Sequence, residues 1–356
     1  MSNYLKENCS LVSEETSTLI KGILIFLIIL GHNKAFTVPL EKWGIMSYLY
    51  MFHVHIFFLL PYLYGGKSVS TSRICVYFVR LYWPYLVFAT ALAVICGGVN
   101  LYESWSVKRW IRLLLFGYVE DIRPMCGNAM LWFLPAMLMT IILKDLYYQS
   151  AYIWRGILLT ISIVINILYI LDSQLHVYSL LLNYVPLGGL HAFRYLLLGV
   201  TFRRLLQWGR VIPKCFNIML CTTIFLVGSY IYCSQVAIHM DREIMCFRLL
   251  QIVMPLCVGC ILCSIMIHHQ NIINRFLCYL GQESFAIYLV SPFVGYFCYY
   301  IISNMNATSW PMGILAQFLI VFLSYSIARK LIKGRLRSIL LPRSLDELKF
   351  KLSLKS

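Results

Sequence analysis

The chain has 356 residues, of which 60% are hydrophobic and only 12% are charged. Soluble domains carry about 25% charged residues, so this composition excludes a soluble enzyme, a disordered scaffold and a nucleic-acid-binding domain. One membrane-spanning helix uses about 20 residues, and the apolar residues suffice for about ten such helices. The composition therefore predicts a polytopic membrane protein.

Apolar runs of spanning length follow one another along nearly the whole chain. Each run should form a helix, because backbone groups in hydrocarbon must be paired within the segment and no β-barrel alternation is present. The predicted fold class is therefore all-α, a polytopic membrane protein with about ten transmembrane helices. The runs lie at 19–36, 44–64, 80–99, 129–147, 153–171, 184–202, 215–235, 244–267, 276–301 and 312–332.

The net charge of +16 has a topological explanation. An even number of spans puts both termini on one side of the membrane, and cytoplasmic termini place most Lys and Arg residues in cytoplasmic segments, as the positive-inside rule requires. We therefore expect a multi-pass protein of the cell (plasma or inner) membrane, with no nucleic-acid partner. Residues 1–333 are expected to form one membrane domain, and residues 334–356 a basic cytoplasmic tail at the anionic leaflet.

Two other features have less bearing on function. The segment from Trp105 to Tyr118 has early basic and late apolar residues, which predicts a helix lying along the outer membrane interface. Cys257, Cys260 and Cys263 would lie along one side of a helix, a spacing that could suggest a soft-metal site. No other ligand is apparent nearby, and buried Cys usually packs as a small apolar residue, so no metal site is predicted.

Ionisable side chains at membrane depth are costly, so each is a functional candidate. Those in or at the edges of the predicted spans include His32, His53, His55, Arg80, His191, Arg194 and Glu283. The first span is the most informative, because Lys21 opens it at the cytoplasmic edge and His32 lies roughly 16 Å further along the helix axis. An imidazole at that depth is suited to move a proton, and Gly31 beside it leaves room for a substrate or a neighbouring helix.

Six segments together resemble the acyltransferase-3 family of membrane O-acyltransferases. The first matches the family's pattern of Lys or Arg, ten residues and His, and all six follow the family's order over most of the chain. The closest resemblance is to the short bacterial members that O-acetylate surface polysaccharides, including fucose 4-O-acetylase-like proteins. The segments are KGILIFLIILGH (Lys21 to His32), FHVHIFFLLPYL (Phe52 to Leu63), RLYWPYL (Arg80 to Leu86), LWFLPAML (Leu131 to Leu138), FRYLLLG (Phe193 to Gly199) and LGQESFAIYLVSPF (Leu280 to Phe293).

The chain departs from the family pattern in several places. His55 stands where the family usually has Pro, and Pro61 and Tyr62 stand where it has Ser-Gly. Ser291 occupies a position where His is common, and the basic cluster before the third span is reduced to Arg73 and Arg80. These differences bear on the acceptor and on the donor contacts more than on the reaction class.

The resemblance implies transfer of an acyl group, usually acetyl, from cytoplasmic acyl-CoA to a sugar hydroxyl of a surface polysaccharide or its lipid-linked precursor. His32 would be the catalytic residue, since a positioned neutral imidazole can remove the hydroxyl proton. A covalent acyl-histidine relay is the alternative for the same residue. Lys21 and Arg80 would bind the phosphates of acyl-CoA, which acts as donor substrate, and no bound cofactor or metal is expected.

The remaining candidates form a predicted substrate-binding or polar cluster: His53, Trp132, Arg194, Glu283, Ser284 and Tyr288. His53 is favoured over His55, because two residues turn a helix by about 200° and both cannot easily face one site. Arg194 needs an anionic partner or ligand inside its span, and Glu283 is a plausible one. Trp132 and Tyr288 could stack on a sugar ring, although aromatic residues in spans more often serve packing or anchoring.

A different function class stays open at this point. A transporter or flippase for a lipid-linked glycan would also line its path with intramembrane charges. Transporters often carry paired interrupted spans in two related halves, and no such halves are apparent in this sequence. Consumption of acetyl-CoA in the presence of acceptor would distinguish the two functions.

Overall fold

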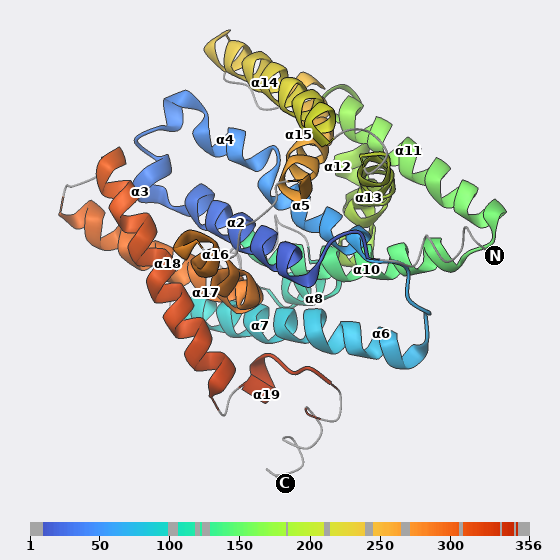
Figure 1. Cartoon of the computed structure of the whole chain (residues 1–356). Coiled ribbons are helices and arrows are strands. Elements are labelled where there is room, and N and C mark those ends of the chain that lie inside the picture. Colours follow the sequence, from blue (N-terminus) through green and yellow to red (C-terminus); the bar gives the residue numbers. More distant parts are fainter. Residues whose placement is uncertain are drawn as a thin grey trace. The chain divides into compact units, whose positions relative to one another are not determined.

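A computed structural model describes residues 10–98, 106–117, 122, 129–182, 184–209, 214–238, 245–264, 271–305, 309–334, 337–344 and 347. Within these ranges the secondary structure is helical and contains no strand, which confirms the predicted all-α class. The helices are shown in Figure 1. Their bounds are α2 Glu14–His32, α3 Lys34–Thr37, η1 Glu41–Trp43, α4 Ile45–Tyr50, α5 His53–Leu59, η2 Leu60–Leu63, α6 Thr71–Tyr77, η3 Phe78–Tyr82, α7 Trp83–Gly98, α8 Val107–Phe116, η4 Ala129–Trp132, α10 Phe133–Gln149, α11 Tyr152–Leu175, α12 Val177–Leu182, η5 Pro186–Gly188, α13 Gly189–Trp208, α14 Lys214–Ile238, α15 Met245–Ser264, α16 Ile272–Gln282, α17 Ser284–Asn304, α18 Trp310–Lys333 and α19 Arg337–Leu340.

Among the described residues, nine helical segments are long and apolar enough to cross a membrane. Each overlaps one of the ten predicted runs. The remaining run, 184–202, overlaps α13, which is 20 residues long and extends beyond the end of the run. Arg194, Arg203 and Arg204 lie within α13, and these charges keep it outside the set defined by length and apolar composition. The nine segments are Glu14–His32, Ile45–Leu63, Thr71–Val94, Met130–Gln149, Tyr152–Asp172, Phe216–Ser234, Met245–Ser264, Ser284–Asn304 and Trp310–Lys333.

The chain divides into two compact units. Unit 1 comprises residues 1–8, 65–197 and 331–356, and unit 2 comprises residues 9–64 and 198–330. Helix α13 begins in unit 1 and ends in unit 2.

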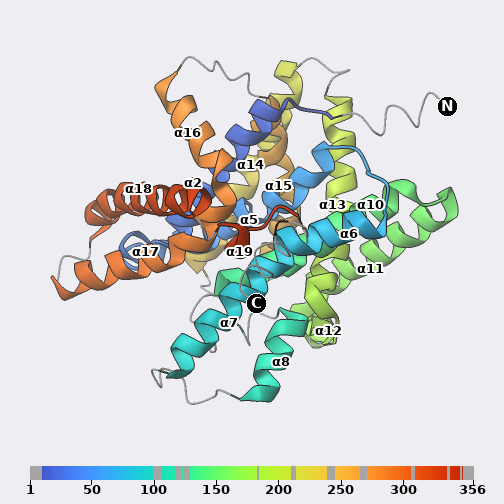
Figure 2. The same ribbon diagram turned by 90° about the horizontal axis from the view of Figure 1, so that it is seen from below.

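In unit 2, α2 and α16 cross with their backbones almost in contact (Figures 1 and 2). A Cβ atom on Gly22 would lie 1.9 Å from the carbonyl oxygen of Leu277, and a Cβ on Gly281 would lie 1.8 Å from that of Thr18. No side chain other than hydrogen fits at either position. Transmembrane helices approach this closely only through small residues, because packing rather than a hydrophobic force holds them together.

The C-terminal end of α2 is fixed to α18 by polar side chains, also in unit 2. Asn33 follows the last residue of α2 and is 1% exposed. Its amide donates to the carbonyl of Gly313 at 2.9 Å and to the side chain of Gln317 at 3.3 Å. Gln317 in turn donates to the carbonyl of Phe26 at 3.1 Å. These bonds join the end of α2 to the first turns of α18, while the Asn33 Oδ1 has no hydrogen-bond partner among the described residues.

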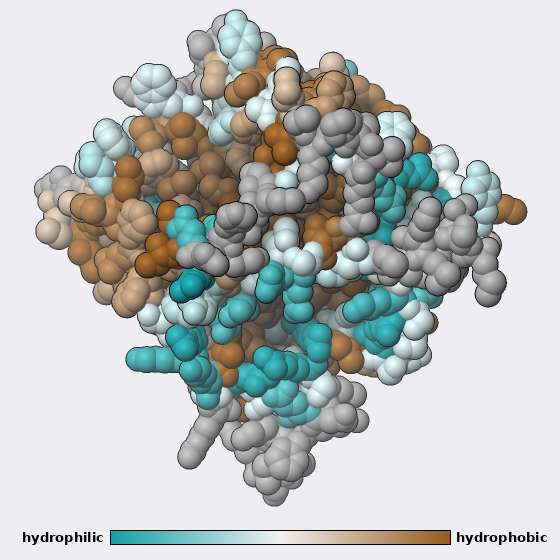
Figure 3. Space-filling model, viewed as in Figure 1, coloured by the Kyte–Doolittle hydropathy of each residue, from teal (hydrophilic) through white to brown (hydrophobic). Residues whose placement is uncertain are grey.

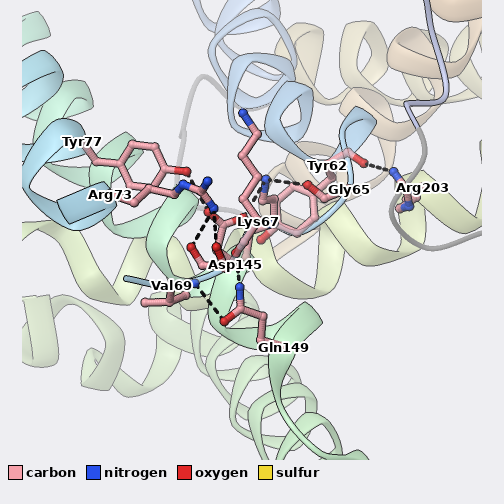
Figure 4. Close-up of polar contacts among 11 residues, drawn as sticks. Tyr62, Gly65, Lys67, Val69, Arg73, Tyr77, Asp145, Gln149 and Arg203 are labelled. Carbon is pink, nitrogen blue, oxygen red and sulfur yellow. Dashed lines mark hydrogen bonds and ion pairs between the residues drawn. The ribbon is translucent and has the colours of Figure 1, made fainter. Parts of the chain in front are cut away.

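The last turn of the second span is held by α13 within unit 2. Buried Arg203 donates from Nη1 to the carbonyl oxygen of Tyr62 at 2.9 Å (Figure 4). The Tyr62 ring lies against Gly199, where a Cβ would be only 2.2 Å from Cδ2 of that ring. The glycine therefore provides the space that the tyrosine fills.

In unit 1, Asp145 on α10 is the centre of a buried polar group (Figure 4). Its carboxylate pairs with Lys144 at 3.1 Å, and both side chains are nearly fully buried. It also accepts the backbone N–H of Lys67 at 3.0 Å and the hydroxyl of Tyr77 at 2.8 Å. A buried charge is tolerated when it is paired and hydrogen-bonded, and Asp145 meets both conditions.

Gln149, one helical turn after Asp145, binds the backbone of the same loop through both the oxygen and the nitrogen of its amide (Figure 4). Its Oε1 accepts the backbone N–H of Val69 at 2.9 Å, and its Nε2 donates to the carbonyl of Lys67. Asp145 and Gln149 therefore hold the segment before α6 against the end of α10.

Helix α8 occupies part of the segment predicted to lie along the membrane interface. Lys108 and Arg109 are exposed and Leu113 is fully buried. The carbonyls of its last turn accept hydrogen bonds from Tyr82, at 2.5 Å, and from Tyr85. The helix is thus amphipathic, and hydrogen bonds from η3 and α7 hold its last turn. Its position at the membrane interface stays a prediction.

Large apolar side chains cover the outer faces of the spans, as a lipid-facing surface requires. Figure 3 shows apolar residues gathered over α17 and α18. The exposed residues there include Tyr296, Phe297, Leu315, Phe318 and Phe322, each more than half exposed. A soluble protein rarely exposes so large a contiguous apolar surface, whereas the hydrocarbon interior of a bilayer would cover it.

We predict a topology that reporter fusions can test. Fusions near positions 67, 150, 208 and 340 should report a cytoplasmic location, and fusions near 176 and 306 an external one. The pair at 176 and 208 decides whether α13 crosses the membrane despite its three arginines. If both report the same side, the span number is odd and the cytoplasmic assignment of both termini is wrong.

The helix crossing in unit 2 generates a second prediction. Gly22→Ala should lower the free energy of unfolding by at least about 1–3 kcal/mol, the usual cost of overpacking, because its methyl group meets the backbone of Leu277. Unfolding by denaturing detergent in mixed micelles would measure the change.

Gly295→Ala in α17 is the matched control. Its Cβ would have no neighbour within 4 Å. Because alanine forms helices more readily than glycine by about 1 kcal/mol, this variant should be neutral or slightly more stable. Equal losses in the two variants would mean that the α2–α16 contact is not as close as described.

Candidate functional site

An interruption of the second span positions His53 in unit 2. Helix α4 ends at Tyr50 and α5 begins at His53, with Phe52 in a non-helical conformation between them. The carbonyl of Leu49 accepts the backbone N–H of Phe52 at 3.2 Å and, in addition, the Nδ1–H of His53. In an unbroken helix this carbonyl would accept the backbone N–H of residue 53, so the imidazole takes the place of a helical hydrogen bond.

This bond also fixes the tautomer of His53. A carbonyl oxygen only accepts, so the proton of the neutral ring must sit on Nδ1 and Nε2 must carry a lone pair. His53 is completely buried, and its Nε2 has no hydrogen-bond partner among the described residues. The interruption therefore leaves a buried acceptor nitrogen without a donor.

His32, the last residue of α2, lies beside this group. The hydroxyl oxygen of Tyr50 is 2.6 Å from Nε2 of His32, and the Tyr50 ring packs edge-on against His53 with 5.0 Å between ring centroids. A Cβ on Gly31 would lie 3.6–3.7 Å from the His53 ring and from Tyr50. Tyr50 thus stands between two imidazoles, and Gly31 borders the same space.

His32 and Tyr50 are only partly buried, whereas His53 is fully buried. Part of the group is therefore exposed at the surface of unit 2. An imidazole of this kind can accept a proton from a hydroxyl, and the Tyr50 hydroxyl can pass a proton to or from His32. We refer to His32, Tyr50 and His53 as the histidine–tyrosine group.

The family-like segment from Leu280 to Phe293 also belongs to unit 2, and one of its residues lies near the histidine–tyrosine group. Tyr288 on α17 is 7% exposed and lies near Tyr50. Glu283 and Ser284 lie at the junction of α16 and α17 and are partly buried. The structure thus associates Tyr288 with the histidine–tyrosine group, while the roles of Glu283 and Ser284 stay predictions.

The two predicted donor-binding cations are in different units. Lys21 is partly buried on α2 in unit 2, eleven residues before His32. Arg80 is in unit 1, in the π-helical turn η3, a distortion often found at functional sites. Arg80 is exposed, and its Nε donates to the carbonyl of Arg343 in the tail at 3.0 Å.

Trp132 and Arg194 belong to unit 1 and form part of a second cluster. The Trp132 ring lies 5.0 Å from that of His191, and Nδ1 of His191 is 3.1 Å from the hydroxyl of Tyr178. The guanidinium of Arg194 lies 3.6 Å above the Tyr169 ring. Glu283, the plausible partner of Arg194, is in unit 2.

Some contributors were missed by the sequence reasoning. Tyr50 precedes His53 by three residues, but the break between α4 and α5 decides where its ring lies, and the sequence carries no clear signal for that break. Lys144 lies near the end of the fourth predicted span, and the structure pairs it with Asp145 inside unit 1. The adjacency of a Lys and an Asp at the end of an apolar run could have indicated this pair.

Burial raises the pKa of the Tyr178 hydroxyl above its ordinary value. A phenol with an ordinary pKa of about 10 is already neutral at physiological pH, and burial reinforces this because the phenolate would lose its hydration. Tyr178 therefore supplies no negative charge.

Comparison with known proteins identifies no relative. No family model matches the sequence, and neither a curated protein nor a solved structure does so. The resemblance to the acyltransferase-3 family therefore depends on the six segments alone, and the reaction that it implies is a proposal.

Proposed function

We propose that this protein is a membrane O-acyltransferase that moves an acyl group, most simply acetyl, from cytoplasmic acyl-CoA to a sugar hydroxyl of a surface polysaccharide or its lipid-linked precursor. The observation that carries the proposal is the histidine–tyrosine group. It places two imidazoles and one phenol together inside a membrane protein, at two of the segments that resemble the family.

The chemistry needs little more than a base in the right place. The sugar hydroxyl attacks the thioester carbonyl, its O–H bond breaks as the new C–O bond forms, and His32 takes the proton. When the tetrahedral intermediate collapses, the C–S bond breaks and the same proton passes to the departing CoA sulfur. The products are an O-acyl sugar and free CoA, and His32 returns to its neutral form.

His53 would act on the same substrate as an acceptor. Because its tautomer is fixed, its Nε2 can receive a hydrogen bond from a hydroxyl but cannot donate one to it. A sugar hydroxyl held between His53 and His32 would be oriented before it loses its proton. This orientation would contribute to the rate separately from proton transfer.

The donor side of the proposal is supported by cations. Lys21 and Arg80 both fall in family-like segments, and guanidinium and ammonium groups are the usual partners of phosphate. Among the described residues, the exposed guanidinium of Arg80 makes its hydrogen bond to Arg343 through Nε, and its terminal nitrogens would bind the phosphate.

A transporter or flippase would make different demands on the same residues. It would move a glycan without consuming acyl-CoA, whereas an acyltransferase releases one CoA for each ester formed. Purified protein in lipid nanodiscs with acetyl-CoA and a cell-derived glycan acceptor distinguishes them. Release of free CoA that depends on acceptor supports the proposal, and glycan movement without CoA release contradicts it.

The central prediction concerns His32. His32→Gln keeps a side chain of similar size but cannot act as a base, so the rate of acyl transfer should fall by about 10²–10⁴-fold. A larger loss would favour the covalent acyl-histidine relay. Acceptor-dependent CoA release and O-acyl signals in the glycan by NMR would measure it.

His55→Gln is the control, two residues from His53 on the other side of α5. It should insert at normal levels and keep most of the activity. Tyr50→Phe removes only the hydroxyl next to His32 and should cause a smaller loss than His32→Gln. Near wild-type turnover in purified His32→Gln would return His32 to a structural role and remove the catalytic assignment.

A separate prediction concerns the donor. Neutral substitutions at Lys21 and Arg80 should raise the apparent KM for acyl-CoA with less effect on kcat, because they remove binding rather than chemistry. Arg80→Lys should also impair binding, since a point charge replaces a bidentate fork. Silent substitutions in well-folded protein would leave both residues with a purely topological role.

A further inference from the structure

Unit 1 contains an arginine whose environment is unusual for a buried charge. Arg194 on α13 is 3% exposed. Its guanidinium lies over the Tyr169 ring, at 3.6 Å from the ring centroid, and 5.4 Å from the centroid of Tyr195. The Tyr178 hydroxyl is its one hydrogen-bonded side chain among the described residues. The cation is therefore enclosed largely by aromatic rings.

In Arg194, the edge of the guanidinium formed by Nε and Nη2 has no hydrogen-bond partner among the described residues. Both nitrogens are buried. These two N–H groups point in parallel and form the side-on fork that matches two oxygens of a carboxylate or phosphate. Burying two unsatisfied N–H donors of a charged group is costly. We therefore expect a bound ligand to supply the acceptors for these two donors.

A second arginine of unit 1 shows what a structural arginine looks like here. Arg155 on α11 also lies over a tyrosine, with its Cζ 5.7 Å from the centroid of the Tyr147 ring. Its Nε donates to the carbonyl of Ser150 at 3.0 Å and its Nη2 to that of Tyr148 at 2.6 Å. The same fork that is unpaired in Arg194 is thus fully used in Arg155.

The described part of unit 1 offers Arg194 no anion of its own. The carboxylate of Asp145 pairs with Lys144, and that of Glu347 lies 3.9 Å from Arg337. Asp172 accepts from both the backbone and the hydroxyl of Ser179. Tyr178 is held neutral by burial, so it supplies an oxygen but no charge.

Aromatic side chains connect this guanidinium with the surface of unit 1. His191 and Trp132 are only partly buried, in contrast to Arg194. His191 reaches Tyr178, which contacts Arg194, and Trp132 packs on His191. An indole and an imidazole beside a cation are well suited to a sugar ring that carries an acidic group.

We propose that Arg194 is the anchor of an oxyanion-binding site in unit 1, which holds a carboxylate or phosphate group through Nε and Nη2. This inference rests on the proposed function and adds to it a class of acceptor. The acylated glycan would be acidic, through the carboxylate of a uronic acid or the phosphate of its lipid carrier. Trp132 and His191 would contact the adjoining sugar.

Binding to the full-length protein in nanodiscs of zwitterionic phosphatidylcholine tests the proposal. The probes are sodium glucuronate, neutral glucose, and phosphatidate incorporated in the nanodisc lipid. The increase of the unfolding temperature with probe concentration gives the apparent Kd. We expect glucuronate or phosphatidate to stabilise the wild-type protein and glucose to have no effect. A response to glucuronate identifies an acidic sugar as the ligand, and a response to phosphatidate a lipid phosphate.

Substitution of the two arginines provides the matched comparison. Arg194→Lys should bind the acidic probe at least about tenfold more weakly, because a point charge replaces the fork. Arg194→Gln should not respond at all. Arg155→Lys and Arg155→Gln should bind as the wild type does, since their fork is used inside the protein.

Stability without any probe gives an independent readout. Removal of an unpaired buried charge should leave the unfolding temperature of Arg194→Gln equal to or above that of the wild type, whereas Arg155→Gln should unfold at a lower temperature. If no acidic probe stabilises the wild type, or if the Arg194 variants bind as tightly as it does, the site does not exist. An Arg194→Gln variant that loses as much stability as Arg155→Gln would make Arg194 structural and overturn the proposal.

These outcomes separate the site from the reaction. An Arg194-dependent response to an acidic probe, in protein that never consumes acyl-CoA, would uphold the oxyanion site and contradict the acyltransferase. Acyl transfer to a neutral glycan without any response to the acidic probes would do the reverse.

Discussion

The need to pair every polar group that enters the apolar interior governs this structure. Asp145 meets it with a lysine, a tyrosine and a backbone N–H, and it thereby fixes the loop that leads into α6. Asn33 meets it in part: its amide nitrogen bonds to Gly313 and Gln317 and ties the first span to the last, while its Oδ1 has no partner among the described residues. Of the buried polar atoms that lack a partner there, Nε2 of His53 and the Nε–Nη2 edge of Arg194 are those that the proposed ligands would pair.

The arrangement of helices could be predicted from the sequence because it depends on hydropathy summed over about 20 residues. Nine of the predicted runs coincide with helices of spanning length and composition among the described residues. The run 184–202, which overlaps α13, is the informative exception. It includes Arg194, and α13 adds Arg203 and Arg204 beyond the end of the run. A hydropathy average over the run does not reveal which partners these arginines find.

The candidate site was predictable only in part, because the sequence shows unusual residues but not the partners that they find in the fold. His32 and His53 stand out because histidine is rare in apolar runs, and the structure brings them together. Tyr50 does not stand out in a chain with 25 tyrosines, and its role depends on the break between α4 and α5. Lys144 and Asp145 are adjacent in the sequence, but only the structure shows that both are buried and paired with each other.

The crossing of α2 and α16 has a consequence for how this sequence can diverge. The atoms that a new methyl group would strike at Gly22 and Gly281 belong to the backbone of the opposite helix. A smaller side chain on the partner cannot relieve such a clash, so no compensating substitution is open to either position. Drift at these sites would require the two helices to separate, and the end of α2 that carries His32 would move with them. Two residues with no side chain thus restrict sequence change more than the polar residues whose placement they support.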